Sequence, residues 1–416
     1  MAGATGQQHY QPLFPHLLFV ALLLVGASLH LYFFFYSDEY TIVSSKKKPS
    51  DKLAERGSST SLNATVGKPQ TEKCDLFTGE WIPNASNPAY DTSCPLIGMA
   101  QNCLVNGRRD TDYLHWKWKP RDCDLPPLDA KRFLETMRDK TWALIGDSLI
   151  RNQGDSLLCI LSKEDLAVDF YHDEAWKTSF FRLPSYNITV LQIWSPFLVA
   201  SQYSDAPPDP GTTAVDQISI DTLDPSWAAL YSSLDYVVVS VGHWFTRPMT
   251  MLVKERELVT GCYNCEGYNL TVFKVEEVYR RVLRLFLNFV GASLHKPTVI
   301  YRSWTSKHFE SGDYNSGGVC NRIVPYKPGE YSGVEMDWKM RGAEMEELDS
   351  GFEGRPLDNL KFLDLYPVAL LRADGHGSKY WSSERKRKNV QDCLHWCLPG
   401  PIDTWNDLLM QLLMSE

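Results

Sequence analysis

The chain has 416 residues, with 42 lysine and arginine residues against 51 aspartate and glutamate residues, and its formal net charge is −9. Hydrophobic residues make up 44% of the chain and charged residues 22%, a globular composition that excludes a disordered, collagen-like or many-spanning membrane protein. The acidic balance argues against a general nucleic-acid-binding protein, which carries a basic face. We therefore expect no nucleic-acid partner.

An apolar segment at residues 17–36 is the first feature along the chain. It reads LLFVALLLVGASLHLYFFFY, with only Ser28 and His30 as polar interruptions. As a helix of about 20 residues it is long enough to cross the hydrocarbon core of a bilayer, and no small-residue cleavage site follows it. The sequence predicts a cytosolic tail at 1–16, a signal-anchor transmembrane helix at 17–36 and a flexible stem at 37–73.

The orientation of this anchor depends on conflicting signals. The lysine run at 46–48 follows the span, and the positive-inside rule alone would place it in the cytoplasm. Ten cysteines and four N-x-[ST] glycosylation sites also follow the span, and together they favour an oxidising lumen. The disulfide candidates are Cys74, Cys94, Cys103, Cys123, Cys159, Cys262, Cys265, Cys320, Cys393 and Cys397, and the glycosylation candidates are Asn63, Asn84, Asn187 and Asn269. We predict a single-pass type II protein with a large lumenal part.

The lumenal part changes character along its length. Residues 74–130 combine four cysteines with many turn residues, and they read as a Cys-rich, loop-dominated lobe. From 131 to 416, short apolar strands alternate with amphipathic helices, which predicts an α/β domain with a parallel sheet flanked by helices. The expected strands are 142–145, 235–240, 298–301 and 362–365, and the expected helices are 149–161, 275–290 and 402–414.

The strongest chemical motif is Gly146-Asp147-Ser148-Leu149, where a buried strand ends and a helix begins. Ligands of open α/β sheets bind at the carboxyl ends of strands. A serine in the first helical turn lies beside free backbone N–H groups, which stabilise the charge that forms when a hydroxyl attacks an acyl carbon. The alternative is that these residues only cap the helix. The same tripeptide recurs at 154–156 without a strand before it, and we assign it no role.

A nucleophilic serine needs a base and a group that orients the base. Asp392 and His395 supply both at a spacing of three, so the carboxylate can hold the ring while its other nitrogen faces Ser148. The alternative is an ordinary surface Asp–His pair. Two further Asp/His pairings, at 172–173 and 374–376, show that such spacing is common.

A second strand ending leads into Gly242-His243-Trp244. Gly242 is a candidate oxyanion donor through its N–H, and His243 and Trp244 are candidates to line the site. The alternative is that the histidine and tryptophan are packing residues of the core.

Zinc is the competing chemistry. Cys262 and Cys265 form one CxxC pair, and Cys393, His395 and Cys397 could complete a ligand set. Structural zinc usually needs a second closely spaced pair, and a lumenal setting favours disulfides. We therefore expect no metal site.

Three stretches of the chain, taken together, resemble the plant trichome birefringence-like family. They are CDLFTGEW (74–81), IGDSLIRNQ (145–153) and DCLHWCLPGPIDTWN (392–406), and RDCDLPP (121–127) and VGHWF (241–245) fit the same pattern. Members of this family are Golgi polysaccharide O-acetyltransferases related to the GDSL/SGNH esterases. The resemblance extends over residues 74–416 and implies an SGNH-hydrolase-like fold with a Cys-rich lobe, a Golgi membrane anchor and disulfides linking the lobe to the catalytic loops.

The resemblance also assigns roles. It implies that Ser148 is the nucleophile and that Asp392 and His395 are the acid/base pair. Arg151 and Asn152, within the second motif, are further candidates for oxyanion or substrate binding. One departure lies before the Gly-His-Trp segment, where many relatives carry asparagine in place of Ser240.

The implied reaction is acetylation of a plant cell-wall hemicellulose through an acetyl-serine. Overall likeness, including the GHWF and GCYNC segments, favours xyloglucan over xylan or mannan. We expect no bound cofactor, but the reaction requires an acetyl donor, either acetyl-CoA or a membrane-delivered acetyl carrier, with an acetyl-donor transporter as a partner. A polysaccharide-binding bridging protein and a carbohydrate acetylesterase are the alternatives.

Overall fold

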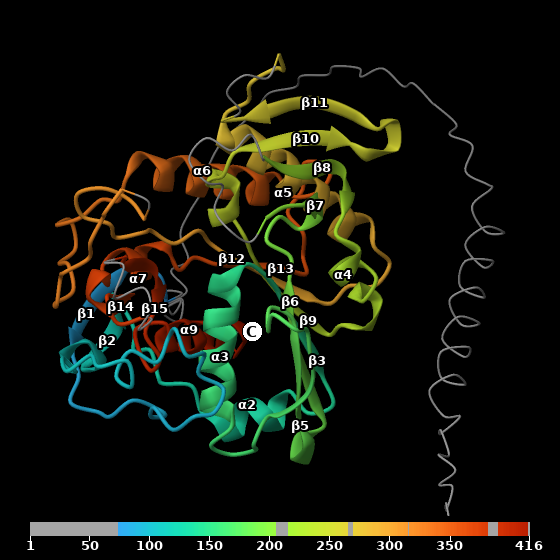
Figure 1. Ribbon diagram of the computed structural model, residues 1–416. Helices are drawn as coiled ribbons and strands as arrows, with labels where there is room; N and C mark the ends of the chain where they lie inside the picture. Colours follow the sequence, from blue (N-terminus) through green and yellow to red (C-terminus); the bar gives the residue numbers. More distant parts are fainter. Residues whose placement is uncertain (1–73, 205–214, 265–268, 315, 382–389, 415–416) are drawn as a thin grey trace, which may run out of the picture. The chain divides into compact units, whose positions relative to one another are not determined.

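The computed structural model describes residues 74–204, 215–264, 269–314, 316–381 and 390–414 (Figure 1). All of them belong to one unit, Thr71–Glu416. The expected tail, anchor helix and stem lie outside the described residues. Within the described residues, no helix combines the length and the apolar character needed to cross a membrane.

A central sheet organises this unit. Within the described residues it has seven strands in the order β13-β12-β9-β3-β6-β5-β4. The strands are β3 (Thr141–Gly146), β4 (Val168–His172), β5 (Ser179–Leu183), β6 (Ile188–Trp194), β9 (Tyr236–Ser240), β12 (Thr298–Arg302) and β13 (Leu360–Leu363). The α/β class expected from the sequence is confirmed.

The expected all-parallel sheet is wrong at one edge. Strands β13, β12, β9, β3 and β6 are parallel, but β5 runs antiparallel to β6 and β4 runs antiparallel to β5. The reason is the length of the connections: only a few residues separate β4 from β5 and β5 from β6, whereas a parallel crossover needs a dozen or more.

Alternation along the strands separates two hydrophobic layers. In β3, Trp142 and Leu144 belong to one buried cluster, and Ala143 and Ile145 belong to the other. Successive side chains of a strand point to opposite faces of the sheet, so β3 contributes side chains to both layers. The sheet is therefore covered on both sides, which Figure 1 shows with α3 and α9 on one side and α4 on the other.

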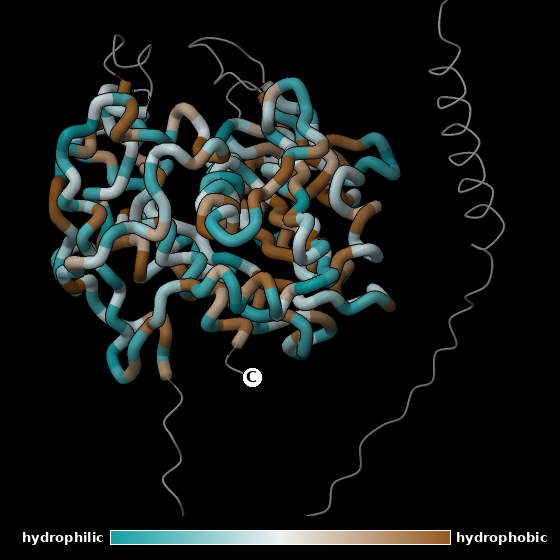
Figure 2. The backbone as a smooth tube through the Cα atoms, turned by 90° about the horizontal axis from the view of Figure 1, so that it is seen from below, coloured by the Kyte–Doolittle hydropathy of each residue, from teal (hydrophilic) through white to brown (hydrophobic). Residues whose placement is uncertain are grey.

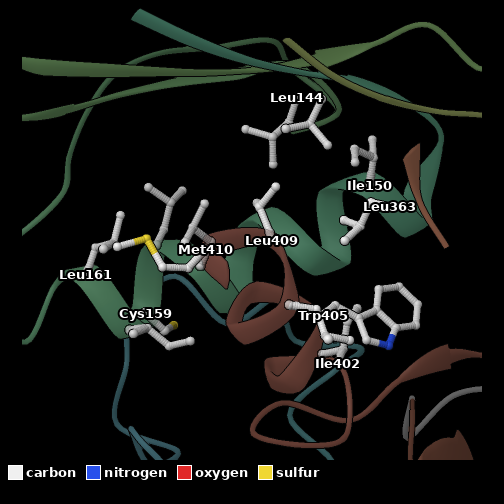
Figure 3. Packing of buried hydrophobic residues seen from close by; sticks show 14 of the residues in the cluster. Leu144, Ile150, Cys159, Leu161, Leu363, Ile402, Trp405, Leu409 and Met410 are labelled. Carbon is white, nitrogen blue, oxygen red and sulfur yellow. The ribbon is translucent and has the colours of Figure 1, made fainter. Parts of the chain in front are cut away.

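Each of the two hydrophobic layers contains its own set of helices. The first layer holds α2 (Ala130–Thr136), α3 (Ser148–Leu161) and α9 (Asp403–Met414), and the second holds α4 (Pro225–Ala228), α5 (Val275–Ala292) and α6 (Glu335–Ser350). Figure 3 shows α9 side chains such as Trp405 and Leu409 packed with Ile150 of α3 and Leu144 of β3. Helix α9 thus packs on α3, the first helix after β3.

Three smaller sheets complete the described part of the chain. They pair β1 (Gly79–Pro83) with β2 (Trp116–Pro120), β14 (His376–Ser378) with β15 (Asp392–Trp396), and order β11 (Leu258–Tyr263), β10 (Met249–Val253), β8 (Asp216–Leu223) and β7 (Val199–Gln202) in a third. Short helical turns are α7 (Tyr366–Leu370), η1 (Asp112–Leu114), η2 (Pro184–Tyr186), η3 (Tyr231–Ser233), η4 (His243–Thr246), η5 (Lys254–Arg256) and η6 (Ala373–Gly375). In Figure 2 many loops at the edge of this unit are hydrophilic, and hydrophobic stretches run through its interior.

Disulfides tie the N-terminal lobe to the rest of the unit. Within the described residues, four pairs are formed: Cys74–Cys123, Cys94–Cys159, Cys103–Cys397 and Cys320–Cys393. Cys262 is also disulfide-bonded, and Cys265 lies outside the described residues. Two of the four pairs cross from the lobe to α3 and to the segment after β15. Of these two, the Cys103–Cys397 pair agrees with the expected link between the lobe and the loop of Asp392 and His395, whereas Cys94–Cys159 reaches the far end of α3.

Candidate active site

Ser148 is the first residue of α3, directly after the turn that ends β3. Gly146 adopts φ +153°, and a Cβ atom there would collide with the carbonyl oxygen of Ser240 on the neighbouring strand. Asp147 is the N-cap of the helix, and its carboxylate accepts a hydrogen bond from the Leu149 N–H at 3.0 Å. The glycine lets the chain turn tightly and the aspartate caps the helix, so the serine hydroxyl lies at the carboxyl edge of the sheet.

A hydrogen-bonded relay starts at this serine. The Nε2 atom of His395 lies 2.6 Å from Ser148 Oγ, and its Nδ1 atom lies 2.8 Å from Asp392 Oδ2. The other carboxylate oxygen of Asp392 accepts backbone N–H groups of Leu394 and His395, at 3.0 and 2.9 Å. The carboxylate therefore fixes the ring so that Nε2 faces the hydroxyl, which is the geometry of a serine nucleophile with its base.

The protonation states agree with that geometry. Burial lowers the pKa of His395, but the charge of Asp392 and the hydrogen bond to it act more strongly in sum, and the pKa ends above its usual value. Burial raises the pKa of Asp392, and its attraction and hydrogen bonds to His395 outweigh this, so the pKa lies far below its usual range. The carboxylate is therefore ionised and stabilises the imidazolium that forms during proton transfer.

Strand β15 carries both relay residues, and Asn152 holds this strand. The side chain of Asn152 is fully buried on α3, four residues after Ser148. It accepts a hydrogen bond from the Trp396 N–H at 2.8 Å and donates one to the Trp396 carbonyl at 3.3 Å. Both of its polar atoms are thus bound to the residue after His395. This geometry fits a positioning residue better than the oxyanion or substrate contact expected from the sequence.

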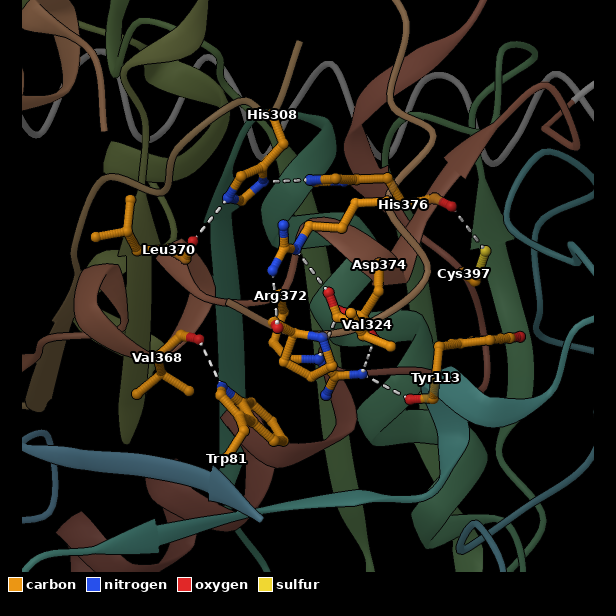
Figure 4. Close-up of polar contacts among 12 residues, drawn as sticks. Trp81, Tyr113, His308, Val324, Val368, Leu370, Arg372, Asp374, His376 and Cys397 are labelled. Carbon is orange, nitrogen blue, oxygen red and sulfur yellow. Dashed lines mark hydrogen bonds and ion pairs between the residues drawn. The ribbon is translucent and has the colours of Figure 1, made fainter. Parts of the chain in front are cut away.

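A buried polar cluster supports β15 from behind (Figure 4). His376 Nδ1 lies 3.0 Å from the His395 carbonyl, and its Nε2 lies 2.7 Å from His308 Nδ1. The other nitrogen of His308 lies 2.9 Å from the Leu370 carbonyl. Burial lowers the pKa of both His308, to about 4, and His376. These rings connect the backbone of His395 to β14 and to the carboxyl end of α7.

The segment after β9 forms the next part of the site. Gly242 has φ +149°, and a Cβ atom there would lie 2.8 Å from the ring of Trp304. His243 stacks on the same tryptophan at 4.0 Å between ring centroids, and neither of its ring nitrogens has a hydrogen-bond partner among the described residues. Burial, followed by the charges of Lys307, Arg302 and His395, lowers the pKa of His243 well below its usual value. This imidazole is therefore neutral.

Two carboxylates of α6 hold Trp304 in place. Asp337 accepts its indole N–H at 2.8 Å, and Glu344 accepts its backbone N–H at 2.8 and 3.0 Å. Glu344 also accepts the hydroxyl of Tyr279 at 2.7 Å, and burial raises its pKa to about 8. The ring on which His243 stacks is thus rigidly positioned.

Arg302 brings a buried positive charge to the same edge of the sheet. It is 1% exposed at the end of β12, and its Nε and Nη1 atoms have no hydrogen-bond partner among the described residues. Burial lowers its pKa to about 10, and the charge of Asp147 opposes that effect. Burial raises the pKa of Asp147, and Arg302 is the largest influence lowering it. The two opposite charges therefore stabilise each other, with Asp147 directly before Ser148 in the chain.

Two tryptophan rings pack together next to the turn that leads to Ser148. Trp194 is the register partner of Gly146, and its ring meets that of Trp244 edge-on at 5.4 Å between centroids. Arg151 lies one helical turn after Ser148 and donates to the Trp176 carbonyl at 2.9 Å. Trp244 thus packs against Trp194, and Arg151 links α3 to the loop between β4 and β5.

The other motifs considered at the sequence level form different contacts. His172 pairs with Asp169 at 2.6 Å, and Asp374 pairs with Arg372 at 2.8 Å. Ser156 is fully buried and donates to Asp403 at 2.6 Å. None of these groups joins the relay.

The proposed zinc ligands are also engaged elsewhere. Cys393 and Cys397 form disulfides with Cys320 and Cys103, so neither is available as a thiolate. His395 is hydrogen-bonded to Ser148 and Asp392. The described residues contain no group of three or more His, Cys, Asp or Glu residues arranged to hold a metal ion.

Sequence reasoning missed Arg302, Trp304 and Trp194. The first two follow the predicted strand 298–301, and the rule that sites form at carboxyl ends of strands would have marked them. Trp194 ends β6, which was not predicted at all. Its segment, ITVLQIW, is a short, mostly apolar run rich in β-branched residues, which is typical of a buried strand.

Comparisons with known proteins agree with this geometry. A family model described as "GDSL/SGNH-like Acyl-Esterase family found in Pmr5 and Cas1p" matches residues 125–412, and one described as "PMR5 N terminal Domain" matches residues 72–124. Protein trichome birefringence-like 26 of Arabidopsis thaliana is 43% identical over 362 residues, which cover 85% of this chain and 80% of that protein.

Two further relatives carry activities in their names. Xyloglucan O-acetyltransferase 1 of Arabidopsis thaliana is 39% identical over 350 residues, covering 82% of this chain and 80% of that protein. Xyloglucan O-acetyltransferase 4 of Populus trichocarpa is 36% identical over 348 residues, covering 83% and 82%. The chain therefore belongs to the GDSL/SGNH-like acyl-esterase family, among the trichome birefringence-like proteins, and it is an acyltransferase.

Proposed function

We propose that this protein is a polysaccharide O-acetyltransferase that works through an acetyl-serine at Ser148. The observation that carries the proposal is the relay of Ser148, His395 and Asp392, with contacts of 2.6 and 2.8 Å. The names of two similar proteins, both xyloglucan O-acetyltransferases, support the same chemistry.

The first half-reaction acetylates the serine. His395 Nε2 takes the hydroxyl proton of Ser148 while Oγ attacks the acetyl carbonyl of the donor. Collapse of the tetrahedral intermediate breaks the bond to the donor's leaving group, which receives the proton from Nε2. The N–H of Gly242 is the proposed donor to the oxyanion, since Gly242 follows Ser240, the register partner of Gly146.

The second half-reaction transfers the acetyl group to a sugar. A hydroxyl of the acceptor gives its proton to His395 Nε2 and attacks the acetyl carbon of the ester. The Ser148 Oγ leaves and takes that proton back, which restores the starting state. Asp392 stays ionised throughout and stabilises the imidazolium in both steps.

The acceptor is proposed to be a plant hemicellulose, with xyloglucan favoured over xylan or mannan. Support for xyloglucan comes from the names of two relatives, which are 36% and 39% identical to this chain. The donor is proposed to be acetyl-CoA or a membrane-delivered acetyl carrier, supplied through an acetyl-donor transporter.

The proposed location is the Golgi membrane, with the catalytic part in the lumen. The cysteine pairing described above requires an oxidising compartment and supports this placement. Of the glycosylation candidates, Asn187 and Asn269 are exposed, Asn84 is half-buried, and Asn63 lies outside the described residues. We propose the two exposed asparagines as the first sites to examine for glycans.

Ser148→Ala tests the proposal directly. The full-length chain is incubated with an acetyl donor and xyloglucan, xylan and mannan oligosaccharides, and acceptor masses are read. The wild-type chain should add acetyl groups and show an acetyl adduct on the Ser148 peptide, and Ser148→Ala should do neither. Ser156→Ala is the matched control, because it removes a serine from the same tripeptide outside the relay and should keep transfer.

Three outcomes would contradict the proposal. Full transfer by Ser148→Ala would exclude the acetyl-serine. Loss of acetyl groups from pre-acetylated oligosaccharides, without any gain, would indicate an acetylesterase. Acceptor binding with neither transfer nor an acetyl adduct on Ser148 would indicate a polysaccharide-binding bridging protein.

A further inference from the structure

The loop between β4 and β5 lies at the same edge of the sheet as Ser148. Strand β4 is antiparallel to β5, β5 is antiparallel to β6, and β6 is parallel to β3. Strand β4 therefore runs in the direction of β3, and its carboxyl end opens onto the edge that carries the nucleophile. Residues 173–178 connect the two strands at that edge.

Trp176, in this loop, is a large aromatic side chain left open to solvent. It is 53% exposed. One face of its indole is covered by His172, whose ring is stacked at 3.5 Å and 15° to it. His172 is itself held by Asp169 at 2.6 Å. The other indole surface of Trp176 stays exposed, and the stacked ring of His172 supports the orientation of the indole.

The backbone of Trp176 is in an unfavourable conformation. Its φ of +54° is the left-handed region, where a bulky residue is a genuine outlier and glycine is the usual choice. The turn is enforced by Asp173, whose carbonyl accepts the Trp176 N–H and whose carboxylate accepts the N–H groups of Lys177 and Thr178 at 2.9 Å. Strain that the surrounding structure maintains is commonly found at binding sites.

The loop of Trp176 is connected directly to α3, the helix that begins with Ser148. Arg151, one turn after Ser148, donates to the Trp176 carbonyl at 2.9 Å, and its charge also acts on His395. Between the loop and the nucleophile lies Trp194, the register partner of Gly146, with the Lys177 ammonium 5.0 Å from its ring. A ligand resting on Trp176 would therefore lie at the same edge of the sheet as the acetylated serine.

We propose that Trp176 is an acceptor-binding residue, on which a sugar ring of the polysaccharide stacks with its C–H face while a hydroxyl of the chain reaches Ser148. This inference rests on the proposed function and adds a binding site to it. A flat apolar ring that is exposed, braced and strained suits the C–H face of a pyranose, and polar groups around it suit the hydroxyls. The catalytic relay remains separate, because Trp176 contacts none of its three residues in the hydrogen bonds described.

Two substitutions test the platform in the Ser148→Ala background, where no turnover occurs. Binding of xyloglucan, xylan and mannan oligosaccharides to the full-length chain is measured by isothermal titration calorimetry. Adding Trp176→Ala or Trp176→Gly should weaken binding of the preferred oligosaccharide about 5- to 10-fold. Because glycine relieves the backbone strain, the Tm of Trp176→Gly should equal or exceed that of its parent, which a purely structural tryptophan would not allow.

Trp338→Ala is the matched control, since Trp338 is a 60% exposed tryptophan on α6, in the opposite layer. Its binding should match the parent. Unchanged affinity in both Trp176 variants would overturn the proposal, as would a fall in Tm that accompanies weaker binding or the absence of binding by every oligosaccharide. A failure of the proposed function can be distinguished from a failure of this inference. The transfer assay compares the wild-type chain with Ser148→Ala, and both of these keep Trp176.

Discussion

At the scale of single residues, the site depends on side chains whose protonation is fixed by their neighbours. One carboxylate oxygen of Asp392 accepts hydrogen bonds from two backbone N–H groups, and the other oxygen is hydrogen-bonded to the ring of His395. The same carboxylate therefore shapes the turn and sets the charge of the base. A substitution there alters both the orientation of the imidazole and the pH at which it works.

The pH dependence of transfer follows from this pair. His395 must be neutral to accept a proton, and its pKa is raised above the usual 6.5. The kcat/KM of the wild-type chain should therefore fall as the pH drops, with a midpoint above 6.5. Asp392→Asn removes the charge that raises the pKa, so the midpoint should move to lower pH, and kcat should fall by about 10⁴-fold.

The measurement is a pH profile of initial rates with one oligosaccharide acceptor. Asp374→Asn is a suitable comparison, because that carboxylate pairs with Arg372 and not with the relay. A midpoint that does not move in Asp392→Asn would show that another group controls the acidic limb.

At the scale of elements, the catalytic geometry depends on how β15 is held. Asn152 binds its Trp396 backbone, the Cys320–Cys393 disulfide fixes the residue after Asp392, and the Cys103–Cys397 disulfide fixes the residue after Trp396. These restraints come from α3, from a distant loop and from the lobe. The strand that carries the base is thus positioned by three different parts of the chain.

Removing one of these restraints should damage catalysis more than it damages the fold. For the double variant Cys320→Ser/Cys393→Ser we expect a loss of about 2–5 kcal/mol in unfolding free energy and a marked fall in kcat, because the freed segment carries Asp392 and His395. Urea unfolding and single-turnover acetylation measure the two effects. The control is Cys74→Ser/Cys123→Ser, which removes a disulfide within the lobe and should spare kcat at a similar cost in stability. Equal kcat losses in both pairs would refute the positioning role.

At the scale of the whole molecule, buried ionisable groups connect stability to pH. Burial raises the pKa of Asp155 and Asp407 to about 7 and that of Glu344 to about 8. These carboxyls bind protons in the folded chain at pH values where the unfolded chain has released them. Their stabilising contribution is therefore lost as the pH rises through the folded pKa.

The unfolding free energy should thus fall as the pH rises from 6.5 toward 8.5, by about 1.4 kcal/mol per pH unit for each proton that the folded chain binds in excess of the unfolded chain. The fall should level off above the folded pKa values. The raised pKa of His395 acts in the same direction. Below pH 6.5 the buried His243, His308 and His376, whose pKa values are lowered, act in the opposite direction. Urea unfolding across this range measures the slope, and a rise in stability toward pH 8.5 would contradict the assignment.

Much of the fold was accessible from local patterns. The apolar runs at 142–145, 235–240 and 298–301 correspond to β3, β9 and β12, and the helical patterns correspond to α3, α5 and α9. The outer strands β4 and β5 were missed. Strand β4, at the edge of the sheet, is mostly exposed, and its apolar residues Val168 and Phe170 face solvent rather than the core. The direction of an edge strand depends on which neighbour it pairs with, and periodicity does not encode that.

By itself, the sequence determined the residue types and spacings that acyl transfer needs: a serine at a strand-to-helix turn, and an aspartate three residues before a histidine. These are local features, since a tight turn and a shared face depend on only a few consecutive residues. Only the tertiary structure decided that His395 faces Ser148 across a separation of 247 residues, that Asn152 binds the strand that carries His395, and that the loop of Trp176 is linked to α3 through Arg151. The physical reason is that such contacts are made by packing two layers on one sheet, and no short segment contains that information.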